Sequence, residues 1–239
     1  MSEAISNVSG LTASVLRRSP LAQTAWLVRL RCDSPDFSWI AGQHIEVTSW
    51  NGRASHMYSI ASSPDARVPG EFDLAISHSL NPELLADLEP GRRVAHSPAR
   101  GNFIWESGQG ATLLIGIGTG VAPLRAILQA ALGSSPEPAL LLLGARTEAD
   151  LLFGDELEAL ARSEQRFIFA PTLSNASAEW SGARGRVHDH LERVLRLLPQ
   201  GRGERRAYVC GSTPMVRDTT NLLDALGVPR ASVRVESYG

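Results

Sequence analysis

The second half of the chain alternates apolar runs with amphipathic stretches, and this alternation limits its fold more than any other feature. Uninterrupted apolar runs favour buried strands, and apolar residues that recur every three or four positions favour helices. Strands that alternate with helices form a parallel, doubly wound sheet. We predict strands at residues 111–116, 139–143, 166–170, 206–209 and 232–235, and helices at residues 122–132, 150–162, 187–198 and 214–226.

The first half has a different pattern. Between residues 11 and 104, short runs rich in β-branched and aromatic residues are separated by turn residues, for example at Asn51-Gly52. Asn-Gly is typical of a tight hairpin, and several short strands at this spacing favour a small antiparallel barrel. A short helix is expected over residues 81–88, because Pro82 suits a first helical turn. The pattern changes near Gly108, so we predict two domains, residues 1–108 and 109–239.

Composition excludes several classes of protein. Hydrophobic residues make up 43% of the 239 residues and charged residues 20%, which is typical of a globular protein with a core. The net charge of -2 argues against nucleic-acid binding, which needs a basic excess. Lys is absent and all 23 Lys and Arg positions are Arg, so an anion site must use Arg, His, hydroxyls or backbone N–H groups.

The titratable side chains and the apolar runs exclude further kinds of site and of protein. Two cysteines, Cys32 and Cys210, cannot supply four thiolates to an iron–sulfur cluster. His188 and His190 lie two residues apart at a predicted helix start, a spacing that does not aim both rings at one ion, so we expect no metal site. The N-terminus shows no secretory signal and no apolar run could span a bilayer. We therefore expect a cytoplasmic protein without a membrane segment.

A glycine-rich turn joins the predicted strand at residues 111–116 to the helix that follows. The turn reads Gly116-x-Gly118-x-Gly120, and Pro123 comes at the helix start. Without side chains, such a turn lets a pyrophosphate approach backbone N–H groups at a helix N-terminus. The spacing differs from the common Gly-x-Gly-x-x-Gly, so a strand–helix turn without a ligand stays the alternative.

Several other motifs occur in a fixed order around this turn. Together they resemble the ferredoxin–NADP reductase superfamily over nearly the whole chain. The resemblance implies a single-chain reductase without a fused ferredoxin domain, in which a flavin-binding antiparallel barrel precedes an NAD(P)-binding α/β domain. The motifs are Ala41-Gly42-Gln43, His56-x-Tyr58-Ser59, Gly101-x-Phe103, the glycine turn through Pro123, Gly144-x-Arg146, Cys210-Gly211 and Glu236-x-Tyr238.

The resemblance also implies roles for single residues. Tyr58 would pack against the flavin ring, and Ser59 would hydrogen-bond near its N5 atom. Cys210 and Glu236 would line the nicotinamide pocket, and Tyr238 would stack on the other flavin face until nicotinamide enters. Ser59, Cys210, Glu236 and Tyr238 are the predicted catalytic residues. The other predicted cofactor-binding residues are His56, Met57, Ser77, Gly101, Gly116, Gly118, Thr119, Gly120, Pro123, Arg146, Ser174, Arg184, Arg186 and Gly211.

Two features depart from the family pattern. His56 stands where the family usually has an Arg that contacts flavin phosphate, and losing such a charge-assisted contact weakens binding by about 1.5–3 kcal/mol. The Gly-x-x-Ser element that caps the flavin diphosphate is not evident, and Ser77 or Ser79 stands near its expected place. Both departures favour loosely bound FAD, with FMN as an alternative flavin.

We therefore predict an FAD-dependent NAD(P)H oxidoreductase. It would pass electrons singly to a separate ferredoxin, flavodoxin or oxygenase component. The choice between NADH and NADPH stays open. Ser174 and either Arg184 or Arg186 could bind the 2′-phosphate of NADPH. A solvated position, or a role at the edge of the sheet, explains both arginines equally well. Alternatives are a free-flavin reductase, which His56 favours, and a non-catalytic nucleotide-sensing or partner-binding module.

Overall fold

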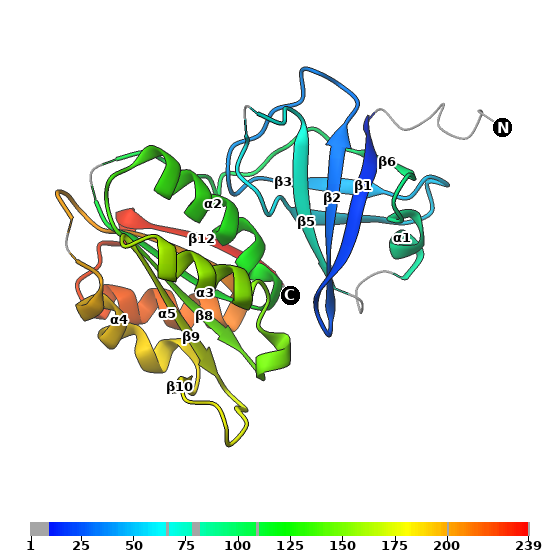
Figure 1. Cartoon of the computed structure of the whole chain (residues 1–239). Helices are drawn as coiled ribbons and strands as arrows, with labels where there is room; N and C mark the ends of the chain where they lie inside the picture. The colour runs from blue at the N-terminus through cyan, green and yellow to red at the C-terminus, as the bar shows by residue number, and fades with distance from the viewer. Residues whose placement is uncertain (1–9, 66, 78–81, 109, 200, 239) are drawn as a thin grey trace.

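The computed structural model describes residues 10–65, 67–77, 82–108, 110–199 and 201–238. It contains two six-stranded sheets that lie side by side, one antiparallel and one parallel (Figure 1). The predicted fold class, an antiparallel barrel followed by a doubly wound parallel sheet, is confirmed. The chain passes from one sheet to the other between His96 and Thr112. The domain boundary near residue 108 stays a prediction.

The antiparallel sheet closes on itself. Its strand order is β4-β3-β6-β1-β2-β5, and Ile60, just after β4, bridges to Leu74 of β5 at the other edge. Closure removes the exposed edges that an open sheet would leave. The elements are β1 (Leu11–Ala22), β2 (Ala25–Cys32), β3 (His44–Thr48), β4 (Ser55–Ser59), β5 (Glu71–Ser77), α1 (Pro82–Asp87) and β6 (Arg93–His96).

Local turn chemistry explains the β3–β4 hairpin. The two strands pair in the predicted antiparallel way around Asn51-Gly52, with Gly52 at a φ of 71°. The loop between Thr48 and Ser55 is longer than the tight turn expected, and within it the Asn51 side chain accepts a hydrogen bond from the N–H of Arg53. Asn81, where the short helix was expected to begin, and Ser79 lie outside the described residues.

The parallel sheet has the order β10-β9-β8-β7-β11-β12. The chain starts at β7, moves outward through β8 and β9, and then crosses to β11 and β12 on the other side of β7. Ligands of such sheets bind where the order reverses, at the carboxyl ends of the strands, here β7 and β11. The elements are β7 (Thr112–Ile117), α2 (Val121–Ser134), β8 (Ala139–Ala145), α3 (Gly154–Ser163), β9 (Phe167–Leu173), β10 (Ala183–Arg184), α4 (Leu191–Leu197), β11 (Arg206–Ser212), α5 (Thr213–Ala225) and β12 (Val233–Tyr238).

Helices cover both faces of the parallel sheet. Side chains at alternate strand positions, such as Leu141 and Leu143, pack with α2 and α3 on one face. Their neighbours Leu140 and Leu142 pack with α4 and α5 on the other. Because both faces are buried, these strands read as continuous apolar runs in the sequence.

Some predicted boundaries were wrong. The helix expected from residue 150 begins at Gly154, because Phe153 takes a left-handed φ of 59° that an α-helix does not tolerate. Residues 187–190, expected to be α-helical, form a 3-10 turn before α4. The last strand extends to Tyr238, because β12 pairs with β11 over its whole length. The short strand β10 was not predicted.

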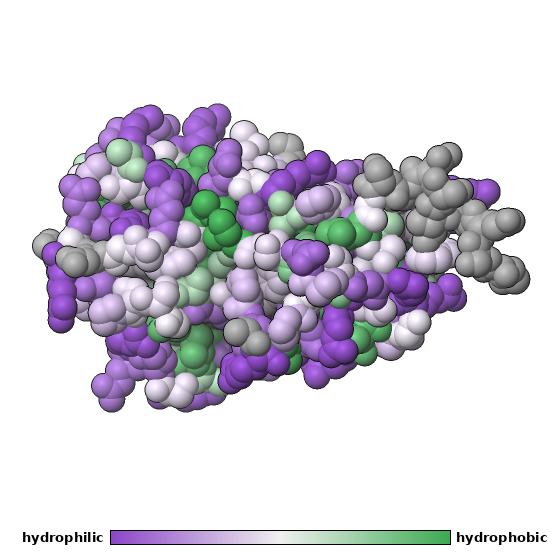
Figure 2. Space-filling view, turned by 90° about the horizontal axis from the view of Figure 1, so that it is seen from above, coloured by the Kyte–Doolittle hydropathy of each residue, from purple (hydrophilic) through white to green (hydrophobic). Residues whose placement is uncertain are grey.

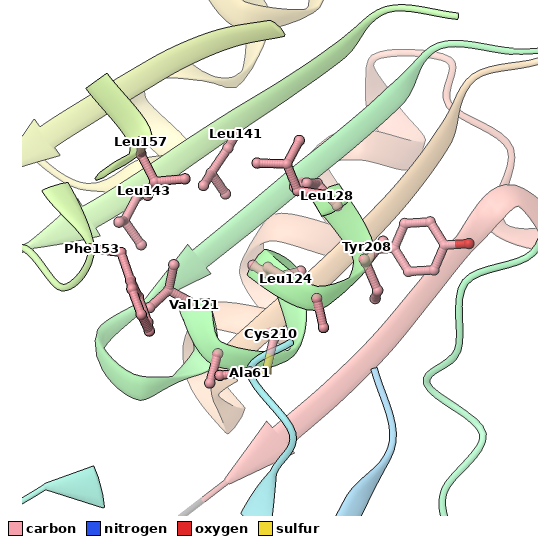
Figure 3. Close-up of a cluster of buried hydrophobic side chains, with 14 of the residues drawn as sticks. Ala61, Val121, Leu124, Leu128, Leu141, Leu143, Phe153, Leu157, Tyr208 and Cys210 are labelled. Atoms are coloured by element: carbon pink, nitrogen blue, oxygen red, sulfur yellow. The ribbon is translucent and has the colours of Figure 1, made fainter. Parts of the chain in front are cut away.

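Helix α2 packs against the barrel as well as against its own sheet. Figure 3 shows Ala61 of the barrel next to Leu124 of α2, and both belong to one buried cluster. The barrel contributes short side chains to this cluster, which lets the helix approach closely. They are Ala25, Ala41, Ala61 and Ala75. The two sheets therefore share a core.

The face of the molecule seen in Figure 2 is mainly polar. In the space-filling view, hydrophilic residues dominate both units, the barrel unit and the parallel-sheet unit, and apolar residues form small separate patches (Figure 2). Single exposed apolar side chains are normal on a folded protein. The large apolar residues that are exposed include Ile40, Trp50, Met57, Val68, Val235 and Tyr238.

Gly42 joins the two units and supports a test of this packing. Its φ is 101°, and a Cβ atom there would lie 2.1 Å from the Phe103 carbonyl oxygen. We expect Gly42→Ala to lower the free energy of unfolding by about 3 kcal/mol or more, because backbone strain adds to a clash. Gly52→Ala is the matched control, since its φ is also positive at 71° but nothing lies within 4 Å of the added atom.

Gly52→Ala should therefore cost only about 1 kcal/mol. Urea denaturation of both variants and the parent measures the two losses. Equal losses would show that the close approach of Gly42 to Phe103 does not stabilise the fold.

Candidate functional site

The glycine turn lies at the carboxyl end of β7, where the strand order reverses. A Cβ atom on Gly116 would lie 2.5 Å from Cδ1 of Leu124, and one on Gly120 would lie 2.5 Å from the carbonyl oxygen of Cys210. Gly118 has a φ of 52° and is exposed. Two of the glycines therefore allow α2 and β11 to approach β7, and the third leaves the backbone open to a ligand.

Pro123 and Gly211 support the same turn. Pro123 is buried in the first turn of α2, where a missing N–H costs no helical hydrogen bond. A Cβ atom on Gly211 would lie 2.8 Å from Cγ1 of Ile117. Both residues thus hold the strands and helix together at the site, and the structure gives each a packing role.

A cavity of about 690 Å³ opens beside the turn. Its walls come from both units, because Thr24 and Ala25 of the barrel line it together with residues that follow β7, β8, β9 and β11. Its size suits a nucleotide-sized ligand. The predicted site residues that it brings together are Ser77, Gly118, Thr119, Arg146, Ser174, Arg186 and Tyr238.

The two arginines between residues 183 and 187 lie in different surroundings. Arg186 lines the cavity and is exposed. Arg184 instead donates hydrogen bonds to the carbonyl oxygens of Ser177, at 2.7 Å, and Trp180, at 2.8 Å. Its guanidinium holds the loop that precedes β10, in agreement with the sheet-edge alternative for this residue.

Ser59, Cys210 and Glu236 meet although they are far apart in the sequence. The Ser59 hydroxyl donates to Oε2 of Glu236 at 3.3 Å, and Glu236 lies opposite Cys210 in the β11–β12 pairing. Burial raises the pKa of the Glu236 carboxyl, and the Ser59 hydrogen bond partly lowers it again. Burial, and then the nearby Glu236 carboxylate, raise the pKa of the Cys210 thiol far above its usual value, so the thiol stays protonated.

His44 was missed at the sequence level and belongs to this cluster. Its Nδ1 lies 3.7 Å from Oε1 of Glu236. Burial, with a smaller contribution from Arg100, lowers the pKa of His44 and favours the neutral ring. Gly101 lies against this ring, since an added Cβ atom would sit 2.9 Å from Nδ1. His44 directly follows the Ala41-Gly42-Gln43 motif, and this position could have identified it as a candidate site residue.

Strand β4 places its motif residues on two faces. His56 and Tyr58 point the same way, with ring centroids 5.0 Å apart, whereas Met57 points outward and is 53% exposed. Tyr58 is buried, and burial raises its pKa to about 12. Its hydroxyl finds no hydrogen-bond partner among the described residues. A buried hydroxyl without a partner costs about 1–3 kcal/mol, so this atom fits a site that a polar cofactor completes.

Tyr238 lies over the glycine turn. Its side chain is 41% exposed, and its hydroxyl donates to the Ile117 carbonyl oxygen at 2.7 Å. The hydroxyl is also 3.4 Å from the position of a Cβ atom on Gly118. Tyr238 therefore covers the mouth of the cavity, and its hydroxyl holds the ring against the glycine turn.

Within the described part of the chain, no group of three or more His, Cys, Asp or Glu side chains could hold a metal ion. His190 Nε2 instead contacts the Arg184 carbonyl oxygen at 3.0 Å. None of the helices in the described ranges is both long enough and apolar enough to span a bilayer.

Comparison with known proteins agrees with this geometry. Residues 114–221 match the family model described as an oxidoreductase NAD-binding domain. The chain is 38% identical over 218 residues to ferredoxin–NADP reductase B of Sorangium cellulosum (strain So ce56). That similarity covers 87% of this chain and 88% of the relative, so it extends over both sheets.

Solved structures share the fold. The ferredoxin reductase in carbazole 1,9a-dioxygenase superposes with a TM-score of 0.83 at 24% identity, covering 97% of this chain and 70% of that chain. A ferredoxin NADP+ reductase from Neisseria gonorrhoeae with bound FAD and NADP has a TM-score of 0.77 at 20% identity, covering 95% and 97%. At these identities the likeness shows the fold, and it covers nearly the whole chain.

The raised pKa of Glu236 predicts how stability depends on pH. An ionised carboxylate whose pKa is raised above the unfolded value of 4.5 costs free energy of folding at higher pH. That cost disappears as the pH falls below 4.5, where both states hold the proton. We therefore expect Glu236→Gln to gain stability relative to the parent as the pH rises above this value, measured by urea denaturation at several pH values.

Ser59→Ala is the matched variant for this test. It removes the hydrogen bond that lowers the pKa of Glu236. The stability of Ser59→Ala should therefore fall more steeply with pH than that of the parent. A difference between Glu236→Gln and the parent that does not change with pH would contradict the assignment.

Proposed function

The chain belongs to the ferredoxin–NADP reductase family, and from this membership we propose that it oxidises NADPH with a bound FAD and passes electrons singly to a separate protein. The predicted enzyme class, an FAD-dependent NAD(P)H oxidoreductase that transfers electrons to a carrier, agrees with the family. The identity of the carrier and the use of NADPH over NADH are proposals.

One observation carries the proposal. Ser59 ends a barrel strand and Glu236 lies in the last strand of the parallel sheet, yet their side chains share a hydrogen bond of 3.3 Å. Glu236 pairs with Cys210, which lies against Gly120 of the glycine turn, and the turn borders the cavity that both units line. A site built this way can hold a flavin from one side and a nicotinamide from the other.

The residues present fit these two groups. When bound, FAD accepts hydride from the nicotinamide and returns the electrons one at a time. Tyr58 offers an aromatic ring and an unpaired hydroxyl to hold the flavin. Ser59 can hold a proton at its Oγ, and the raised pKa of Glu236 suits that carboxyl to exchange it. The neutral Cys210 shapes the pocket without adding charge.

The cavity rim supports the choice of NADPH. Arg146, Ser174 and Arg186 line the same opening, next to one another at the ends of β8, β9 and β10. Arginine guanidinium groups and a hydroxyl together recognise a phosphate by charge-assisted hydrogen bonds. Arg184 is engaged by backbone carbonyls, so we assign the 2′-phosphate to Arg146, Ser174 and Arg186.

The acceptor is proposed from the relatives. Two similar proteins carry the name ferredoxin reductase, one of them from a dioxygenase system. We therefore favour a ferredoxin, a flavodoxin or an oxygenase component as the electron acceptor. A free-flavin reductase stays the second candidate, because His56 offers a weaker phosphate contact than an arginine would.

The absorbance spectrum of the purified protein tests the proposal. We expect flavin bands that survive desalting and bleach under anaerobic conditions with NADPH at a lower concentration than with NADH. A colourless protein that reduces only added flavin would support the free-flavin reductase instead. If the protein reacts neither with the two nucleotides nor with added flavin, the result would support a nucleotide-sensing or partner-binding module.

Tyr238 supports a second test of the site. Because its ring covers the cavity mouth, Tyr238→Ser should tighten NADP+ binding by about tenfold, which corresponds to the about 1.4 kcal/mol needed to displace an aromatic stack. Tyr238→Phe is the matched control, since it keeps the ring and removes only the hydroxyl, which donates to the Ile117 carbonyl oxygen. Titration calorimetry measures both affinities, and equal binding by the serine variant and the parent would exclude Tyr238 as the gate.

A further inference from the structure

Arg125 is a buried charged residue outside the site described above. It lies on α2, and its side chain is only 9% exposed. Its Nε and Nη2 donate to the two carboxylate oxygens of Glu156 at 2.7 and 3.0 Å. Its Nη1 donates to the Ala61 carbonyl oxygen at 2.6 Å and to Oδ2 of Asp73 at 3.4 Å. Four of the five N–H groups of the guanidinium therefore donate hydrogen bonds.

These partners come from both sheets. Ala61 and Asp73 belong to the barrel, whereas Glu156 lies on α3 of the parallel-sheet unit. Asp73, which is 1% exposed, is held from its other side by Arg29 at 2.8 and 3.0 Å. Two arginines and two carboxylates thus form a neutral group across the interface. Arg125 and Asp73 are buried, whereas the side chains of Arg29 and Glu156 are 50% and 44% exposed. Such ion pairs contribute little net stability, but their hydrogen bonds are directional.

The position of Arg125 connects this group of ion pairs to the functional site. Ala61 follows Ser59 by two residues, and Arg125 lies in the second turn of the helix that begins at the glycine turn. The guanidinium therefore spans the short distance between the two halves of the site. One helical turn further on, the Gln129 side chain accepts a hydrogen bond from the N–H of Ser63 at 2.9 Å.

Packing alone does not fix the two units on this side. A cleft of about 680 Å³ lies between the barrel loop and α2, and Arg125, Gln129 and Trp105 line it. Where the interface is open, directed polar contacts decide the spacing. Ser59 itself contacts Glu236 across the interface, and the next polar contact between the units along this segment is that of Ala61 with Arg125.

We propose that Arg125 is a positioning residue, which holds the Ala61 segment and therefore Ser59 at a fixed distance from the glycine turn and so aligns the nicotinamide with the flavin. The proposal rests on the proposed function. It acts through Ser59 and the turn, without contact between Arg125 and either cofactor. A displacement of about 1 Å can slow an aligned reaction by about 100-fold.

The test compares Arg125→Met with Arg29→Met in the full chain. Both variants remove one guanidinium from Asp73 and keep a side chain of similar length, but only Arg125 links the two units. Stopped-flow absorbance measures flavin reduction by NADPH, and ferricyanide measures reoxidation separately. Amide hydrogen exchange over residues 60–63, measured on the purified protein without nucleotide, reports how firmly the segment is held, independently of activity.

We expect Arg125→Met to slow flavin reduction by about tenfold or more, leave reoxidation unchanged, and speed amide exchange over residues 60–63. Arg29→Met should match the parent in all three. Arg125→Lys is the second variant in case the methionine variant does not fold, and it should slow reduction several-fold, because an ammonium cannot reach Ala61 and Glu156 together.

A folded Arg125 variant with the parent's reduction rate and exchange would overturn the proposal, even if its melting temperature falls. Equal effects of Arg125→Met and Arg29→Met would also overturn the proposal, because the loss of an ion pair with Asp73 would then explain the slower flavin reduction. If the parent reduces no flavin, the proposed function fails. Amide exchange over residues 60–63 still decides whether Arg125 holds the segment.

Discussion

The packing of α2 between two sheets is the contact on which the rest of the structure depends. One side of the helix completes the core of the parallel sheet, and another meets alanines of the barrel, such as Ala41 and Ala61. The glycine turn at its start can approach β11 only because Gly120 has no Cβ atom. Moving α2 would therefore move the turn, the shared core and the contact of Arg125 with the barrel at once.

Much of this arrangement could be predicted from the sequence, because local patterns determine it. Continuous apolar runs mark strands buried on both faces, and alternating short runs with Asn51-Gly52 mark the barrel. The order of the motifs placed Ser59, Cys210 and Glu236 in one predicted site, and the structure brings these side chains together. Long apolar segments and ordered motifs are signals that do not need three-dimensional context.

Other features depend on contacts that a linear pattern does not contain. The late start of α3 follows from the left-handed backbone at Phe153, whose ring packs on the Arg125 guanidinium at 4.8 Å. Arg184 and Arg186 look alike in the sequence, and only the carbonyls around Arg184 separate their roles. Arg125 itself reads as an ordinary helix residue, because Ala61 and Asp73 are distant in sequence.

The electrostatics of the site follow from its place between the units. Burial lowers the pKa of His44, and it raises those of Cys210 and Glu236. All three shifts favour the uncharged form, whereas two arginines, Arg146 and Arg186, lie at the cavity rim. That division suits a ligand whose phosphates bind at the rim and whose uncharged reduced ring enters the centre. It also explains why the spacing of the two units matters, since a wider gap would admit water and remove the cause of every shift.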